Sequence, residues 1–177
     1  MNEPESTPSA ATRASRARSL PTPGAKRATV IGAGSFGTAL AVLLARGGLR
    51  TTLQARTSEQ AASLDQEREN RVYLPGVELP GQLRIEPAAA GVARADYLFL
   101  AVPSSGLGEV IATLSAAGLG RRAAVVSVAK GLVPPEGLPP TTVLGSTFGI
   151  HRIACLGGPA HAREMVRAGA ALVKLGK

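Results

Sequence analysis

The chain has 177 residues, a hydrophobic content of 45% and a formal net charge of +8, which excludes disorder throughout and fits one globular domain. Aromatic residues make up only 3%, and the positive charge forms no block interleaved with aromatics, which disfavours a nucleic-acid partner. No apolar run approaches the roughly 18 residues of a membrane span, and residues 1–27 lack the hydrophobic region of a signal peptide, so we expect a disordered leader and a cytoplasmic location.

From residue 28 onward, β-prone runs alternate with helix-compatible stretches. We expect strands over residues 28–33, 50–55, 83–86, 96–102, 123–129, 152–157 and 170–175, and helices over 35–46, 58–69, 87–94, 105–117 and 159–168. Prolines and glycines in 70–82 and 131–140 predict irregular connections. This alternation is typical of βαβ units, so the predicted fold class is α/β, a Rossmann-like, doubly wound, mostly parallel sheet with helices on both faces.

The single cysteine, Cys155, lies in the apolar run RIACLG, and we expect it to be a small core residue. His161 and Glu164 are the best candidates for metal ligands. Two such side chains do not make a persuasive set, so no metal site is predicted.

The segment GAGSFG, residues 32–37, matches the glycine pattern of dinucleotide-binding proteins. It begins where the first predicted strand ends and opens a helix, the context in which the pattern has a mechanism. Gly32 would permit the tight turn, Gly34 would leave room for a pyrophosphate, and Gly37 would let the helix pack close to the strand. The helix N-terminus would face the phosphates, with Ser35 in a hydrogen-bonding role.

Three further residues follow predicted strands, where a doubly wound sheet collects ligands. Arg56 ends the second strand, where proteins that bind NAD often carry a carboxylate. A guanidinium there favours an adenosine 2′-phosphate, so NADP(H) is predicted as the cofactor and NAD(H) is the alternative. Pro103 would shape a loop near the cofactor, and Lys130 lies at the tip of another strand.

These motifs together resemble the NAD(P)-dependent glycerol-3-phosphate dehydrogenases. The matching segments are IGAGSFGTALA, LQAR, NRVYLPG, VPSS and AKGL, with GGPAHARE as a looser sixth, and they cover residues 28–175. The resemblance implies reversible hydride transfer between NAD(P)H and dihydroxyacetone phosphate, which gives sn-glycerol 3-phosphate for phospholipid synthesis. The resemblance also allows a homodimer of the full-length family members.

Site residues follow from the resemblance by position. Ser35 and Phe36 would contact the cofactor, with Phe36 in place of a frequent Trp or Tyr. Arg56 would meet the adenosine end, Lys130 would touch both cofactor and substrate, and Ala162 would touch the cofactor.

Gly158 and Ala160 would meet the substrate. Family members commonly have Ser or Thr at the position of Ala160, so a hydroxyl contact is lost there. The family's proton-transferring lysine belongs to a helical domain expected beyond Lys177, which implies that residues 28–177 form the cofactor-binding half and that this catalytic residue is absent from the chain. Two alternatives stay open: an NADP(H)-binding module without catalysis, and another dehydrogenase of the β-hydroxyacid or 6-phosphogluconate type.

Overall fold

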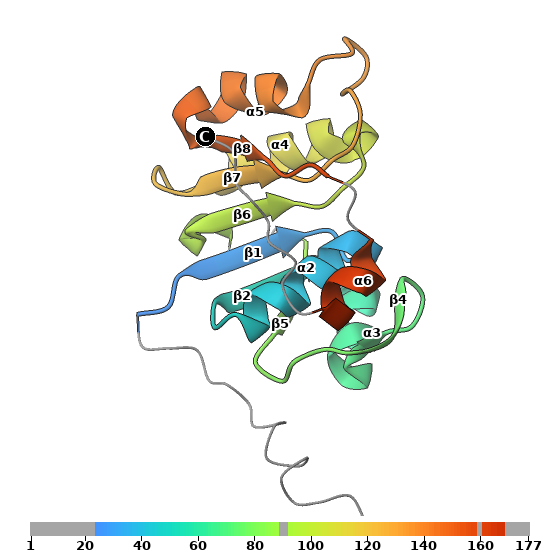
Figure 1. The fold of residues 1–177 in the computed structure, drawn as a ribbon. Helices are drawn as coiled ribbons and strands as arrows, with labels where there is room; N and C mark the ends of the chain where they lie inside the picture. The colour runs from blue at the N-terminus through green and yellow to red at the C-terminus, as the bar shows by residue number, and fades with distance from the viewer. Residues whose placement is uncertain (1–23, 89–91, 159–160, 169–177) are drawn as a thin grey trace, which may run out of the picture.

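The computed structural model describes residues 24–88, 92–158 and 161–168. Its main sheet has six parallel strands in the spatial order β5-β2-β1-β6-β7-β8 (Figure 1). The strands are β1 (Arg27–Ile31), β2 (Arg50–Ala55), β5 (Arg84–Pro87), β6 (Tyr97–Leu100), β7 (Ala124–Ser127) and β8 (Ile153–Cys155). The predicted strand 170–175 and residues 1–23 of the expected leader lie outside the described residues. The doubly wound parallel sheet is confirmed.

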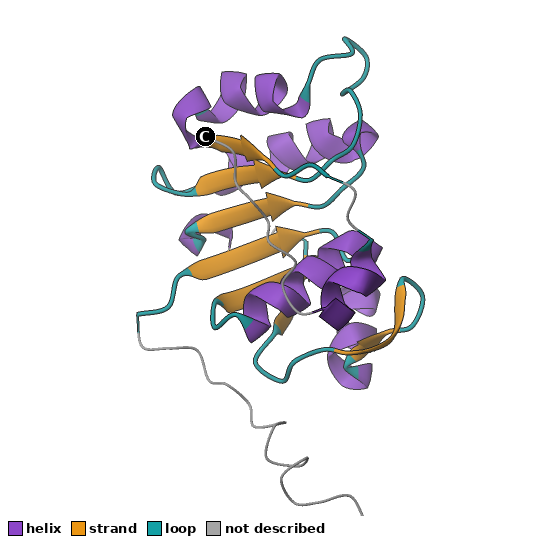
Figure 2. Cartoon of the chain, viewed as in Figure 1, coloured by secondary structure: helices purple, strands orange, loops and turns teal. Residues whose placement is uncertain are grey.

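Helices connect the strands and cover both faces of the sheet (Figure 2). They are α2 (Ser35–Arg46), α3 (Ser58–Glu67), α4 (Leu107–Ala117), α5 (Pro140–Phe148) and α6 (Ala162–Ala168), with short 3-10 turns at Val92–Arg94, Ser104–Gly106 and Ile150–Arg152. Within the described ranges, none of these helices is both long enough and apolar enough to cross a membrane.

Alternating side chains of the strands build two hydrophobic clusters, as strand geometry requires. Val30 belongs to the cluster under α2 and α3, whereas its neighbour Ile31 belongs to the cluster under α4 and α5. Both side chains are buried. Helix α6 packs beside α2, where Arg46 Nη1 donates to the backbone oxygen of Val166 at 3.3 Å. Each face of the sheet therefore has its own core.

The structure corrects several predictions. Residues 70–82 were expected to be irregular, but they contribute to a hairpin of β3 (Glu69–Asn70) and β4 (Leu74–Glu78). A helix was expected over 87–94, but residue 87 still belongs to β5 and pairs with β2. Further along this range, the described residues form a 3-10 turn at Val92–Arg94. Helix α5 was not assigned from the sequence.

Cys155 is exposed, so its assignment to the core was wrong. It ends β8, one of the two edge strands of the described sheet. An apolar stretch of sequence does not show whether another element covers the end of a strand. Its neighbour Ala154 is only partly buried as well.

The order of the strands creates a crevice between β1 and β6. From β1 the chain moves outward to β2 and β5, and it then returns to β6 on the other side. The connections that leave β1 and β6 therefore run to opposite faces of the sheet. In open α/β sheets, ligands bind at such a switch point, outside the carboxyl ends of the strands.

Candidate functional site

The glycine loop lies at this switch point, between β1 and α2. Gly32 has a φ of 108°, and a Cβ on it would lie 2.9 Å from the carbonyl carbon of Ala101 and closer still to its oxygen. A Cβ on Gly37 would collide with the carbonyl oxygen of Gly32 and lie 2.9 Å from the Cβ of Ala101. These two glycines allow β1, α2 and the end of β6 to approach one another closely.

Gly34 has a different environment. It has a φ of −77°, and nothing in the described chain lies within 4 Å of the place where its Cβ would be. It is the N-cap of α2 and provides no side-chain cap, and the first turn of the helix carries no acidic residue. The positive end of the helix dipole is thus left for an external anion. The loop fits the phosphates of a dinucleotide.

A cleft of about 590 Å³ opens beside this loop. It unites four of the predicted residues, which come from the loops after three strands: Gly32, Gly34, Arg56 and Pro103. Pro103 opens the turn that leads into α4, and Ala101 N, just before it, donates to Ile31 O at 2.8 Å. The carboxyl ends of β1, β2 and β6 therefore form one wall of the cleft.

Arg56 lies between the end of β2 and the start of α3. Its backbone N donates to Gln60 Oε1 at 3.0 Å, and Thr57 caps α3 by accepting from Gln60 N at 3.2 Å. The side chain of Arg56 is exposed. Arg56 also lines the cleft, so the cleft has an exposed cation that is suited to an anionic group.

Glu59, in the first turn of α3, is the first carboxylate after β2. Hydrogen bonds from the backbone and then from the Thr57 hydroxyl lower the pKa of Glu59 below its ordinary value of 4.5. The cleft does not include Glu59 among its described lining residues, whereas it includes Arg56. The charge facing the cleft from the end of β2 is therefore positive.

The hairpin β3–β4 also reaches the cleft, through Tyr73. Tyr73 is half exposed and lines the cleft together with the glycine loop. Asn70, in the same hairpin, is buried, and its Nδ2 donates to Ala33 O at 2.9 Å and to Thr38 Oγ1 at 2.8 Å. Neither residue was predicted as part of the site, although both belong to the quoted NRVYLPG motif. Helix residues Glu109 and Thr113 complete the cleft and carried no sequence signal.

A second hollow, of about 680 Å³, lies at the opposite ends of the strands. Four arginines contribute to its wall: Arg27, Arg50, Arg84 and Arg94. It is larger than the first cleft, but it has neither the glycine turn nor the start of α2. The features that suit a dinucleotide therefore meet in the cleft at the switch point and not in this hollow.

Comparison with known proteins identifies the family. Residues 27–176 match the family model described as NAD-dependent glycerol-3-phosphate dehydrogenase N-terminus. The chain belongs to this family.

Similar proteins agree with this membership. The glycerol-3-phosphate dehydrogenase [NAD(P)+] of Deinococcus radiodurans is 45% identical over 139 residues, which are 78% of this chain and 40% of that protein. The Thermus thermophilus protein of the same name is 42% identical over 144 residues, covering 80% of this chain and 43% of the relative. The chain thus spans about two fifths of the length of these relatives.

Among solved structures, the glycerol-3-phosphate dehydrogenase from Coxiella burnetii superposes with a TM-score of 0.73 at 27% identity. The match covers 81% of this chain and 44% of that chain. The resemblance seen in the motifs is therefore confirmed in sequence and in fold.

The other predicted residues of this family member are not among the described residues that line the cleft. Ser35 is exposed at the first position of α2, and Phe36 is half-buried against the core under that helix. Ala162 also packs against that core, at the start of α6. Gly37 is buried beneath the loop.

Lys130 and Gly158 follow β7 and β8. Lys130 is exposed, and a Cβ on its neighbour Gly131 would lie 4.0 Å from Ser104 Oγ, so the lysine's loop lies beside the loop after β6. Gly158 is exposed with a φ of 141°. Ala160 lies outside the described residues. Within those residues, no group of three or more His, Cys, Asp or Glu side chains could hold a metal ion.

Proposed function

We propose that this chain binds NADP(H) in the cleft between β1 and β6. The observation that carries the proposal is the meeting of the open Gly34, the uncapped start of α2 and Arg56 in one cleft. Backbone N–H groups at the loop would receive the pyrophosphate. The Arg56 guanidinium would pair with the adenosine 2′-phosphate, and this contact favours NADP(H) over NAD(H).

We further propose that the chain is the cofactor-binding part of an NAD(P)-dependent glycerol-3-phosphate dehydrogenase, the activity named for the relatives that it matches. The bound cofactor would supply or accept a hydride at the carbon that carries oxygen in dihydroxyacetone phosphate or sn-glycerol 3-phosphate. Negative charge gathers on that oxygen as the carbonyl is reduced, so a cation nearby stabilises it. Lys130, after β7, is the residue of the described chain that we assign to this role, and to binding the substrate phosphate.

Gly158, Ala160 and Ala162 complete the proposal. Gly158, with no side chain, would let a substrate approach the backbone after β8, and Ala160 would offer a backbone contact alone. Ala162, which opens α6, would border the cofactor beside α2. A cytoplasmic location and a homodimer of the full-length protein are further proposals, which rest on the resemblance to the family.

Calorimetric titration of the 177-residue chain with NADPH and with NADH tests the binding function. We expect both to bind, NADPH more tightly. A chain that binds neither cofactor while it is folded by circular dichroism would contradict the proposal.

Binding of the cofactor does not imply turnover of a substrate. The ionisable residues in the described lining of the cleft are Arg56, Tyr73 and Glu109, and Lys130 is not among them. We therefore expect the chain alone to bind the cofactor with little oxidation of NADPH when dihydroxyacetone phosphate is added. Rapid oxidation would show that the 177 residues hold a complete active site. Parallel assays with hydroxyacids and with 6-phosphogluconate distinguish the alternative dehydrogenase classes.

A further inference from the structure

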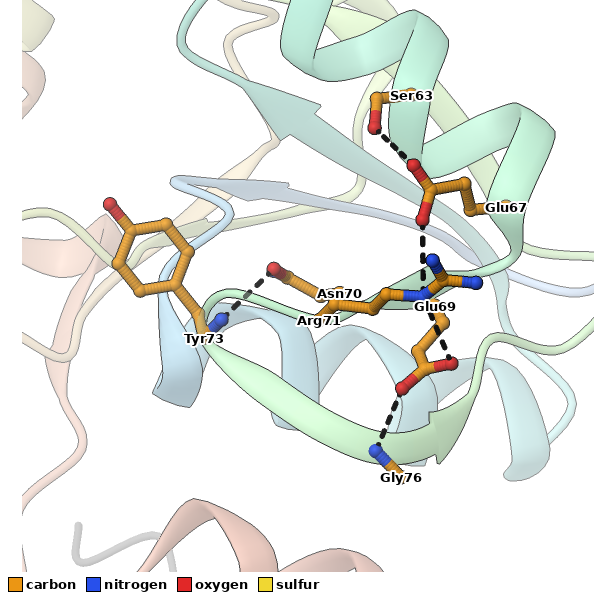
Figure 3. Close-up of polar contacts among 7 residues, drawn as sticks. All are labelled: Ser63, Glu67, Glu69, Asn70, Arg71, Tyr73 and Gly76. Atoms are coloured by element: carbon orange, nitrogen blue, oxygen red, sulfur yellow. Dashed lines mark hydrogen bonds and ion pairs between the residues drawn. The ribbon is translucent and has the colours of Figure 1, made fainter.

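The buried amide of Asn70 connects two segments that border the cleft. Asn70 is 3% exposed, and its Nδ2 donates both to Ala33 O in the glycine loop and to Thr38 Oγ1 in α2. Its Oδ1 accepts from the backbone N of Tyr73 at 3.2 Å (Figure 3). Ala33 O can only accept and Tyr73 N–H can only donate, so the chemistry allows one orientation of the amide.

This contact determines the direction of the peptide group between Ala33 and Gly34. In a trans peptide the C=O and the N–H point in opposite directions. Because Ala33 O points at the buried Asn70, the N–H of Gly34 points away from it. Gly34 lines the cleft, and nothing lies within 4 Å of the place where its Cβ would be.

The fold also leaves the Gly34 N–H without an acceptor among the described residues. The first N–H groups of a helix have no partner within the helix. Within the described residues, the Gly34 carbonyl accepts from Thr38 N at 2.9 Å, but no backbone or side-chain acceptor takes the Gly34 N–H. A donor that is held in one direction, at a residue that lines a cleft, is suited to an anionic oxygen.

We propose that Asn70 is a positioning residue for the phosphate cradle: it holds the Ala33–Gly34 peptide so that the Gly34 N–H donates to a pyrophosphate oxygen of the dinucleotide. The inference rests on the proposed binding function. The same amide holds the backbone at Tyr73, which also lines the cleft. Asn70 therefore sets the glycine loop and the hairpin turn in one arrangement before the ligand binds, and such pre-organisation strengthens binding.

Asn70→Asp tests the proposal with almost no change in shape. It places a carboxylate oxygen against Ala33 O, and this repulsion turns the peptide away. Glu69→Ala is the matched control, because Glu69 interacts within the same hairpin: it accepts from Gly76 N at 2.9 Å and pairs with Arg71 Nε at 3.7 Å (Figure 3). The ligands are NADPH and adenosine 2′-monophosphate, which carries the group assigned to Arg56 but has no pyrophosphate.

For Asn70→Asp we expect NADPH to bind about 10- to 100-fold more weakly, the range for losing a hydrogen bond to a charged group, and adenosine 2′-monophosphate to bind within twofold of the unaltered chain. Glu69→Ala should bind both ligands normally. Unchanged NADPH binding by Asn70→Asp, or an equal loss of both ligands, would overturn the positioning role. An unaltered chain that binds no NADPH would overturn the binding function itself, and this inference with it.

A second measurement needs no variant and so does not depend on whether Asn70→Asp folds. In an NMR titration of the unaltered chain, we expect the Gly34 amide proton to move downfield with NADPH and to stay in place with adenosine 2′-monophosphate. A Gly34 amide that does not respond to NADPH would refute the proposed hydrogen bond.

Discussion

Gly34→Ala and Gly37→Ala place the same methyl group three residues apart and should have opposite effects. At Gly34 the backbone has a φ of −77°, which alanine adopts freely, and the added Cβ meets nothing within 4 Å. Removing the conformational freedom of glycine from the unfolded chain stabilises a protein by about 0.4–1 kcal/mol where the native conformation is compatible. The methyl group would, however, occupy the space that we assign to the pyrophosphate. We therefore expect unchanged or slightly higher stability and NADPH binding at least tenfold weaker, a loss of about 1.4 kcal/mol.

Gly37→Ala should damage the fold instead. Its Cβ would overlap the carbonyl oxygen of Gly32 and lie 2.9 Å from the Cβ of Ala101, so α2 must move away from β1 and β6. Overpacking of this kind lowers the free energy of unfolding by about 1–3 kcal/mol. At about 2–4 °C per kcal/mol for a chain of this size, the melting temperature should fall by roughly 2–12 °C.

Urea unfolding gives the two stabilities, and calorimetry below the transition gives the two NADPH affinities. A Gly34→Ala variant that binds NADPH as tightly as the unaltered chain would refute the assignment of the pyrophosphate to this loop. A Gly37→Ala variant as stable as the unaltered chain would show that α2 can be moved without loss, contrary to the packing described above.

Three further substitutions test other parts of the site. Arg56→Ala should weaken NADPH binding about tenfold or more and leave NADH binding within twofold, because only NADPH carries the 2′-phosphate. Equal losses of both affinities in calorimetry would contradict the pairing of Arg56 with the 2′-phosphate. Thr57→Ala should lower the free energy of unfolding in urea by about 0.5–2 kcal/mol through loss of the α3 cap, whereas Thr57→Ser keeps it. A hydrogen bond from the Thr57 hydroxyl also lowers the pKa of Glu59 below its ordinary value of 4.5. This hydrogen bond therefore stabilises the fold at pH values above 4.5, and its contribution is lost as the pH falls through the lowered pKa. A Thr57→Ala effect that is as large at pH 3 as at pH 7 would contradict this link. Lys130→Ala should change the free energy of unfolding in urea by no more than about 0.5 kcal/mol, because the residue is exposed. In titrations of the NADP complex, it should weaken the binding of sn-glycerol 3-phosphate about tenfold. Unchanged substrate binding would remove Lys130 from the site.

The sequence predicted the strands of the main sheet, and β2 agrees at both ends with its predicted range of 50–55. Residues 96–102 and 123–129 contain β6 and β7, whose Leu98 and Val125 are completely buried. Helix α5 escaped prediction because its sequence, PTTVLGSTF, combines β-branched residues and glycine, which are poor helix formers. Packing stabilises this helix instead, because Leu144 at its centre is completely buried. Only Pro140 at the first helical position is a local sign of the helix.

The same distinction applies to the site. Gly32, Arg56 and Pro103 could be predicted together because each follows a strand, and parallel strands bring their carboxyl ends to one edge. Tyr73 and Asn70 could not be placed in this way. Their hairpin contains Pro75 and Gly76, which suggested an irregular segment, and it is held by contacts such as Asn70 to Ala33, 37 residues apart in the chain. Long-range contacts of this kind leave no local pattern.

The glycine loop is held on two sides, and this explains why its three glycines should differ in function. On one side Ala101 leaves no room for a side chain at Gly32 or Gly37. On the other side Asn70 holds the carbonyl of Ala33. Gly34 lies between these supports and faces open space, so the loop need not rearrange to receive a phosphate. Because the cradle is formed in advance, substitutions that spare its supports should act mainly on the rate at which the cofactor leaves, and substitutions in the supports should act on the fold as well.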